Sequence, residues 1–110
     1  MQGFKLTFFT QQDRSVHGQS LALWLLEQAK EIGIRGATLT AASEGFGHDK
    51  KLHSVHFFEL TEQPLQVTMA VTAEEAELMF ALLKKENINI FYTQAAIEFG
   101  MSEERYPLRT

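Results

Sequence analysis

The stretch Leu65-Gln66-Val67-Thr68-Met69-Ala70-Val71 decides the fold class of this chain. Apolar residues occupy every second position, and this period of two is typical of a strand with one buried face. The next residues, Thr72-Ala73-Glu74-Glu75, fit a capping box, in which a threonine side chain and a glutamate three positions later bond each other's backbone N–H groups. The sequence therefore predicts a strand that runs directly into a helix.

One further helix and four further strands are predicted around this unit. Apolar residues recur at three and four positions from Gln19 to Ile32 and from Ala73 to Glu86, a spacing that places them on one helical face. Gly33 and Asn87 are suited to the left-handed position that ends a helix. Stretches rich in alternating, β-branched or aromatic residues predict the other strands, at Phe4 to Phe9, Ala37 to Ser43, Ser54 to Leu60 and Ile88 to Phe99.

With the segments from Ser54 to Leu60 and from Leu65 to Val71 taken as one strand or a strand pair, this order of elements is that of an α+β, ferredoxin-like βαββαβ sandwich, an antiparallel sheet with two helices on one face. We expect a single domain over residues 1–99 and a C-terminal extension over residues 100–110. The helices would cover only one face, whereas the strands carry apolar side chains on both, as Phe8 and Phe9 do. A second apolar face needs a cover, and copies of the same chain are the simplest one. The sequence therefore predicts an oligomer.

Composition limits the classes of function. A chain of 110 residues with 45% hydrophobic residues fits one folded domain. The formal net charge of −4, with ten Lys and Arg, argues against a nucleic-acid-binding protein. The lack of cysteine excludes disulfides and thiolate metal sites. No apolar run approaches the roughly 20 residues that span a bilayer, and the N-terminus does not look like a signal peptide. We expect a cytoplasmic location.

The segment from Glu44 to His53 interrupts the regular pattern and is the first candidate functional site. Gly45 and Gly47 permit a positive φ or the close approach of a ligand to the backbone. Lys50 and Lys51 supply positive charge. Alternatively, the glycines form only a tight turn at a sheet edge, and the lysines are ordinary exposed cations.

A second candidate site is the polar loop from Thr10 to Gly18, which follows the first predicted strand. Arg14 and His17 in this loop are suited to bind an anion. Alternatively, this loop serves only the fold, with Asp13 capping the next helix. No nucleophile or acid–base pair stands out elsewhere in the chain, so we do not expect an enzyme.

These short motifs resemble the pattern of domain-of-unknown-function family 190, a bacterial family grouped with the P-II-like (PII-like) signalling proteins. The resemblance covers Phe4 to Glu98 and lies in the order and spacing of Phe9-Thr10, Asp13-Arg14, His17-Gly18, Gly36-Ala37-Thr38, Gly45-Phe46-Gly47 and His53-Ser54. It implies a homotrimer whose sheets face the three-fold axis. It also implies ligand clefts between neighbouring subunits, near the base of a long mobile loop. The chain departs from the family relatives that hold adenine nucleotides, because it has Lys84-Lys85-Glu86-Asn87 where they have a glycine-rich basic loop.

We therefore expect a PII-like regulatory protein that senses a small anionic or nucleotide-like ligand in intersubunit clefts. It would regulate a partner through a mobile loop at residues 44–53, with Arg14 and His17 as the opposite wall. The sequence names no cofactor and does not identify the partner, for which a membrane transporter is one candidate. The alternative is a metal-responsive trimer that resembles the divalent-cation tolerance proteins, with His48 and His53 as ligands. Against a shared metal site, His53 and His56 would point to opposite faces of a strand.

Overall fold

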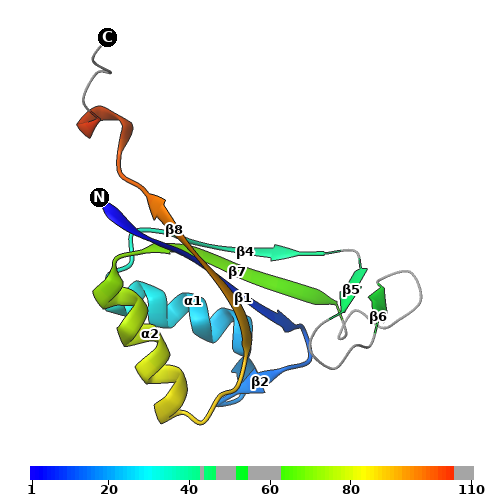
Figure 1. Ribbon diagram of the computed structural model, residues 1–110. Helices are drawn as coiled ribbons and strands as arrows, with labels where there is room; N and C mark the ends of the chain where they lie inside the picture. The colour runs from blue at the N-terminus through cyan, green and yellow to red at the C-terminus, as the bar shows by residue number, and fades with distance from the viewer. Residues whose placement is uncertain (43, 47–51, 55–62, 106–110) are drawn as a thin grey trace.

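The computed structural model describes residues 1–42, 44–46, 52–54 and 63–105 (Figure 1). Its elements in chain order are β1 (Gln2–Gln11), β2 (Ser15–Val16), β3 (Gln19–Ser20), α1 (Leu21–Ile32), β4 (Ala37–Ala41), β5 (Glu44–Phe46), β6 (Leu52–Ser54), β7 (Pro64–Val71), α2 (Ala73–Lys85), β8 (Phe91–Glu98) and the 3₁₀ turn η2 (Ser102–Glu104).

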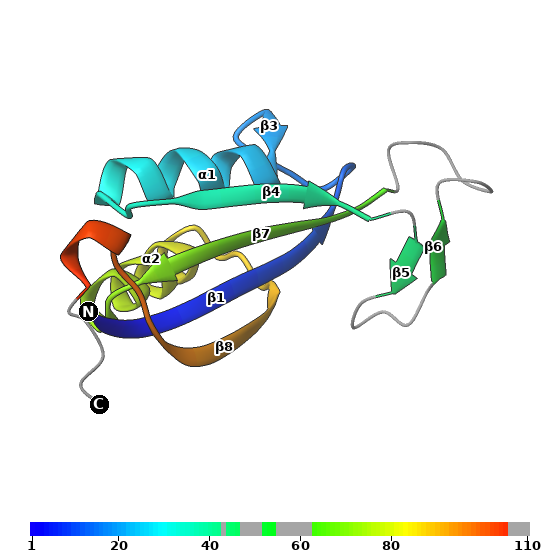
Figure 2. The same cartoon turned by 90° about the horizontal axis from the view of Figure 1, so that it is seen from above.

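Four of the strands form one antiparallel sheet in the order β4-β7-β1-β8. Figure 2 shows the four strands side by side, and Figure 1 shows α1 and α2 together on one face of the sheet. Strand β7 lies between β1 and β4, so the βαβ unit formed by β1, α1 and β4 is split. The predicted α+β, ferredoxin-like βαββαβ sandwich is confirmed.

The hydrophobic core lies between the two helices and the sheet. Alternate residues of β7 point into it, and all four are at most 4% exposed: Leu65, Val67, Met69 and Val71. Strand β1 adds Leu6 and Phe8, α1 adds Leu21, Ala22, Trp24, Leu25 and Ala29, and α2 adds Ala76, Met79 and Leu83. Full burial of a large apolar side chain stabilises the fold by about 1.5–3 kcal/mol. The period of two along β7 therefore fixes which face of the sheet the helices cover.

The predicted end of α1 and the predicted start of α2 are confirmed. Gly33 has φ 95°, and the next residue, Ile34, donates its N–H to the carbonyl of Ala29 at 3.0 Å. The capping box at the start of α2 has both bonds, from the Glu75 N–H to Thr72 Oγ1 at 3.1 Å and from the Thr72 N–H to Glu75 Oε1 at 2.8 Å. Each helix therefore begins or ends where a local backbone requirement is met.

Several predicted boundaries are wrong by a few residues. Strand β1 runs on to Gln11, because it pairs with β7 as far as Pro64. Helix α1 begins at Leu21 rather than Gln19, whose segment forms β3 instead. The described part of β4 ends at Ala41, α2 ends one residue early at Lys85, and β8 is shorter than predicted, at Phe91–Glu98.

The segment predicted as a loop from Glu44 to His53 contains two short strands. Strands β5 and β6 pair antiparallel, with Gly45 opposite His53. The prediction of an unpaired loop is therefore wrong at 44–46 and 52–53, where backbone pairing replaces it. The strand predicted from Ser54 to Leu60 is described only at Ser54, the last residue of β6, and residues 55–60 lie outside the described part of the chain.

The face of the sheet opposite the helices, called here the open face, is less apolar than predicted. Strand register places its side chains in rows, one of which holds a threonine from every strand: Thr38, Thr68, Thr7 and Thr93. Its larger apolar side chains are Phe9, Phe91 and Ile97, and Lys5 is its single charged residue within the four described strands. The predicted apolar side chains are thus present on this second face, but threonine and alanine occupy about half of its positions in the described strands. Of the helices that the structure describes, neither is long and apolar enough to cross a membrane.

Candidate functional site

A short β-hairpin positions His17, one of the predicted site residues. Strands β2 and β3 pair through Ser15 and Ser20, and the two residues between the strands, His17 and Gly18, have φ 51° and 78°. Two consecutive positive φ values are the requirement of a type I′ turn, which matches the twist of the strands it joins. The sequence signal is incomplete, because Gly18 suits the second position of this turn but histidine stands where Asn, Asp or Gly is usual, and the stretch therefore reads as an irregular loop.

The hairpin brings His17 and Arg14 onto one part of the chain, the connection between α2 and β8, residues 86–90. His17 Nε2 lies 2.6 Å from Glu86 Oε2. The Arg14 guanidinium donates a hydrogen bond to the Asn89 carbonyl. Backbone bonds fix the base of this arrangement, since the Leu21 N–H donates to the Arg14 carbonyl at 2.9 Å. The two residues thus act together as a clasp on the α2–β8 connection.

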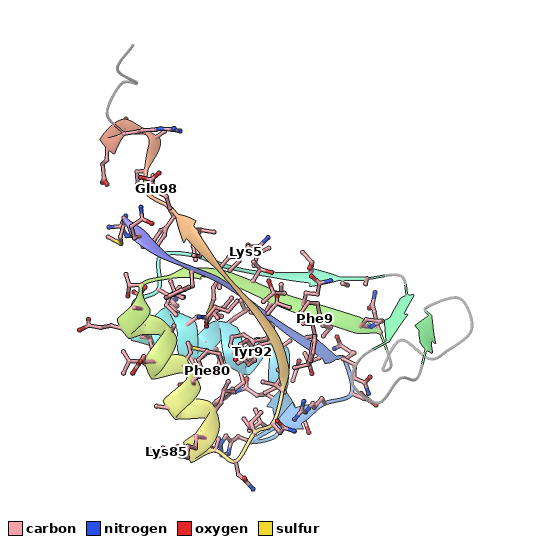
Figure 3. The ribbon with its side chains drawn as sticks, in the orientation of Figure 1. Lys5, Phe9, Phe80, Lys85, Tyr92 and Glu98 are labelled. Atoms are coloured by element: carbon pink, nitrogen blue, oxygen red, sulfur yellow. The ribbon has the colours of Figure 1, made fainter. Side chains whose placement is uncertain are left out.

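A cleft of about 350 Å³ lies beside this clasp. Its lining is mainly apolar and aromatic, from Phe80, Leu83, Ile88, Ile90 and Tyr92. Lys84, Asn87 and Asn89 add charged and amide groups. Figure 3 shows Phe80 and Tyr92 facing each other between α2 and β8, and their ring centroids are 4.8 Å apart. A concave, mostly apolar surface with a few polar groups is typical of small-ligand sites. The Lys84 ammonium would suit an anionic group and the aromatic rings a planar one.

The cleft contains residues that sequence reasoning missed. The sequence marks Lys84 as a departure from the nucleotide-binding relatives and Asn87 as that and a helix stop, neither as a binding residue, and Phe80, Asn89 and Tyr92 give no distinctive signal. Apolar residues on a helix and a strand are predicted to be core, and only the antiparallel pairing of β8 with β1 leaves Tyr92 46% exposed at a sheet edge. Asn87 has φ 57°, which confirms its predicted left-handed conformation.

Of the other predicted site residues, the structure describes only Gly45, and it lies away from the clasp. Gly45 belongs to β5, which lies beyond the end of β4 (Figure 2). Gly47, Lys50 and Lys51 lie outside the described residues, so their proposed roles stay predictions. The partners that the structure describes for the Arg14 and His17 side chains lie in the α2–β8 connection.

The metal hypothesis is not supported by the described residues. His48 lies outside them, and His53 is placed only as a backbone position in β6. Within the described ranges, no three His, Cys, Asp or Glu side chains lie close enough together to hold a metal ion.

Comparisons with known proteins agree with this geometry at the level of the fold. The model of the family DUF190, described as "Uncharacterized ACR", matches residues 3–98. A UPF0166 protein of Aquifex aeolicus (strain VF5) is 36% identical over 73 residues, which are 66% of this chain and 69% of that protein.

The similar solved structures are PII-like signalling proteins. CPII of Thiomonas intermedia K12, a nitrogen regulatory PII-like protein solved with ADP, AMP and bicarbonate, has a TM-score of 0.68 at 15% identity, covering 92% of this chain and 91% of CPII. A proposed PII-like signalling protein of Thermus thermophilus has a TM-score of 0.63 at 18% identity, with 87% of each chain covered. At these identities the structures show a shared fold, and the family match confirms the resemblance found in the sequence. This chain belongs to the DUF190 family.

Proposed function

We propose that this protein is a PII-like regulator that senses a small anionic or nucleotide-like ligand at the α2–β8 connection. One observation carries the proposal: the cleft lined by Lys84 and Tyr92 lies beside the connection that Arg14 and His17 hold. Arg14 contributes a guanidinium with further N–H groups, and Lys84 contributes an ammonium, so an anionic group would meet two cations. The aromatic pair would contact a planar, less polar part of the same ligand. The role is regulatory rather than catalytic.

The structural neighbour CPII supports this choice of ligand class, since it was solved with ADP, AMP and bicarbonate. The present chain keeps a cleft at its α2–β8 connection although it lacks the glycine-rich basic loop of nucleotide-binding relatives. We therefore expect adenine nucleotides and small oxyanions to be the first compounds to test. The ligand's identity stays open within this class.

A ligand in this cleft would act on the segment from Glu44 to Ser54 through the sheet. The α2–β8 connection leads into β8, β8 pairs with β1, and β1 pairs with β7. The start of β7 and the end of β4 both lie next to the β5–β6 pair (Figure 2). If the ligand binds one arrangement of these strands better, it shifts the population toward that arrangement. Lys50 and Lys51 would then present their charge to an unidentified partner, such as a membrane transporter.

Assembly belongs to the same proposal. We propose a cytoplasmic homotrimer, formed by the domain at residues 1–99, in which the open faces of the sheets meet and ligand clefts lie between subunits. The neutral character of the open face supports this arrangement, because Lys5 is its single charge within the described strands. Native mass spectrometry should report three copies of the chain, and a monomer at micromolar concentration would contradict this part of the proposal.

Isothermal titration calorimetry with ADP, AMP, bicarbonate and inorganic phosphate tests the ligand site. At least one compound should bind the native protein, and the change Lys84→Met should weaken binding about tenfold, the effect expected for a charge-assisted contact of about 1.5 kcal/mol. Lys30→Met is the matched control, since Lys30 is also an exposed cation, in the last turn of α1 and away from the cleft. If no compound binds, or if both variants weaken binding equally, the site assignment fails.

A further inference from the structure

Glu86 occupies an electrostatically unfavourable position. It is the C-cap residue of α2, at the negative end of the helix dipole, where a carboxylate is disfavoured and cations such as Lys84 and Lys85 are preferred. Its side chain is only 24% exposed, so water compensates the charge incompletely. The contact that compensates it is the 2.6 Å approach of His17 Nε2.

The helix end does not need this carboxylate. Asn87 in the left-handed conformation stops the helix, and the Ile88 N–H donates to the Leu83 carbonyl at 2.9 Å. The Glu86 backbone N–H bonds the Leu82 carbonyl at 3.0 Å whatever the side chain is. His17 takes its φ of 51° from the type I′ turn of the β2–β3 hairpin, which aims its ring at Glu86. The end of α2 thus carries a carboxylate that the helix does not require, and such local conflicts concentrate at functional sites.

We propose that the Glu86 carboxylate is an internal competitor that occupies the anion position of the clasp until a ligand displaces it. This inference rests on the proposed function, and it names the regulation of that site. The ligand must carry a carboxylate, phosphate or similar oxyanion, because it replaces a carboxylate on His17. His17 is 60% exposed and open to an incoming anion, and Asn87 and Asn89 of the adjacent cleft flank the same connection.

Displacement has a structural consequence. With His17 bound to the ligand, Glu86 leaves the hairpin turn, and the contact between the β2–β3 hairpin and the end of α2 is lost. Arg14 would still hold the Asn89 carbonyl. The start of the α2–β8 connection is thus released while its Asn89 end stays fixed. Ligand binding therefore has to overcome a built-in contact, which sets the ligand concentration at which the protein responds.

The isosteric change Glu86→Gln tests the inference by calorimetry with ADP and with inorganic phosphate. Weakening the competing, partly exposed His17–Glu86 contact should tighten binding roughly two- to fivefold. The control is Glu74→Gln, which makes the same change in net charge in the first turn of α2, at the opposite end of the helix. In a His17→Gln background the Glu86→Gln change should have no effect on affinity, which a double-mutant cycle detects.

The outcomes separate this inference from the proposed function. If the native protein binds ADP or phosphate and Glu86→Gln binds no tighter, internal competition is wrong and the ligand site stands. If Glu74→Gln tightens binding equally, the effect is one of net charge and the inference also fails. If none of the proteins binds ADP, AMP, bicarbonate or phosphate while all show the same thermal unfolding midpoint, the proposed site itself is overturned.

Discussion

The two faces of the central sheet are built from the same strands and have opposite compositions. On β1, Phe8 points to the helices and is 0% exposed, whereas its neighbour Phe9 points to the open face and packs against Phe91 with ring centroids 5.5 Å apart. Figure 3 shows Phe9 and Lys5 on the side of the sheet away from α2. The face toward the helices is buried by α1 and α2 of the same chain. The open face is neutral and only partly apolar, which suits a surface that other copies complete.

The threonine row gives the open face a specific chemistry. Thr7 and Thr68 hydroxyl oxygens lie 3.3 Å apart, and Thr7 is only 7% exposed although no helix covers it. The exposed face of an antiparallel sheet commonly carries charged residues, which keep it in solvent. Threonine side chains instead combine a methyl group with a hydroxyl and pack acceptably in both environments. The comparison therefore predicts that substitutions on the two faces affect different quantities, namely folding on one and assembly on the other.

The largest expected effect comes from Phe8→Ala. Loss of a fully buried phenylalanine should lower the free energy of unfolding by about 3–5 kcal/mol, because the transfer free energy is lost and a cavity is left. The matched variant Phe9→Ala should cost clearly less in the same urea titration, since Phe9 is half-buried at the open face. Equal losses for the two variants would mean that the open face is as tightly packed within one subunit as the core.

The contrast between the faces explains how much of the fold was predictable. Strict alternation from Leu65 to Val71 and the capping box at Thr72 are local signals, and both elements follow from them. The sequence predicts a more apolar open face than the described strands have. The pattern of one strand does not say which residues of the adjacent strands lie beside it, so it does not give the composition of the whole face. Only the register, with Thr7 opposite both Thr68 and Thr93, reveals the threonine row.

A second prediction concerns Gly3 in β1, where the Phe99 ring lies close to the backbone. A Cβ added to Gly3 would lie 2.1 Å from the Val71 carbonyl oxygen and 2.7 Å from the Phe99 ring. Gly3→Ala should therefore cost about 1–3 kcal/mol through overpacking, because backbone as well as a side chain has to move. Gly36→Ala is the control, since nothing lies within 4 Å of its added Cβ. If the thermal midpoints of the two variants agree, β1 and β7 can separate there without loss.

The candidate site was predictable in part, for a related reason. Arg14 and His17 were identified as polar residues after a strand, and the structure brings both to one place. Their partners Glu86 and Asn89 lie 69 and 75 residues away along the chain. Two separate features bring the β2–β3 hairpin and the α2–β8 connection together: the type I′ turn and the left-handed conformation of Asn87. A local pattern predicts the left-handed Asn87, but neither the turn at His17 and Gly18 nor the meeting of the two segments is predicted from the sequence.

The smallest expected effect on folding, and the sharpest test of the open face, comes from Lys5→Met. Lys5 is exposed between Ala70 and Ala95 and has no ion pair within the described chain. The change should alter the free energy of unfolding of a dissociated subunit by no more than about 0.5 kcal/mol, as is usual for surface positions. In an assembly that brings open faces together, however, each buried ammonium costs free energy unless it is paired.

Methionine keeps the length of the side chain without the charge, so Lys5→Met should raise the oligomer's resistance to dilution in native mass spectrometry, while Lys30→Met should not. If Lys5→Met instead weakens the oligomer, Lys5 pairs with an acceptor of a neighbouring copy, and the open face is a specific polar interface rather than a neutral one. If neither variant changes the mass distribution, the open face faces solvent and the copies meet elsewhere.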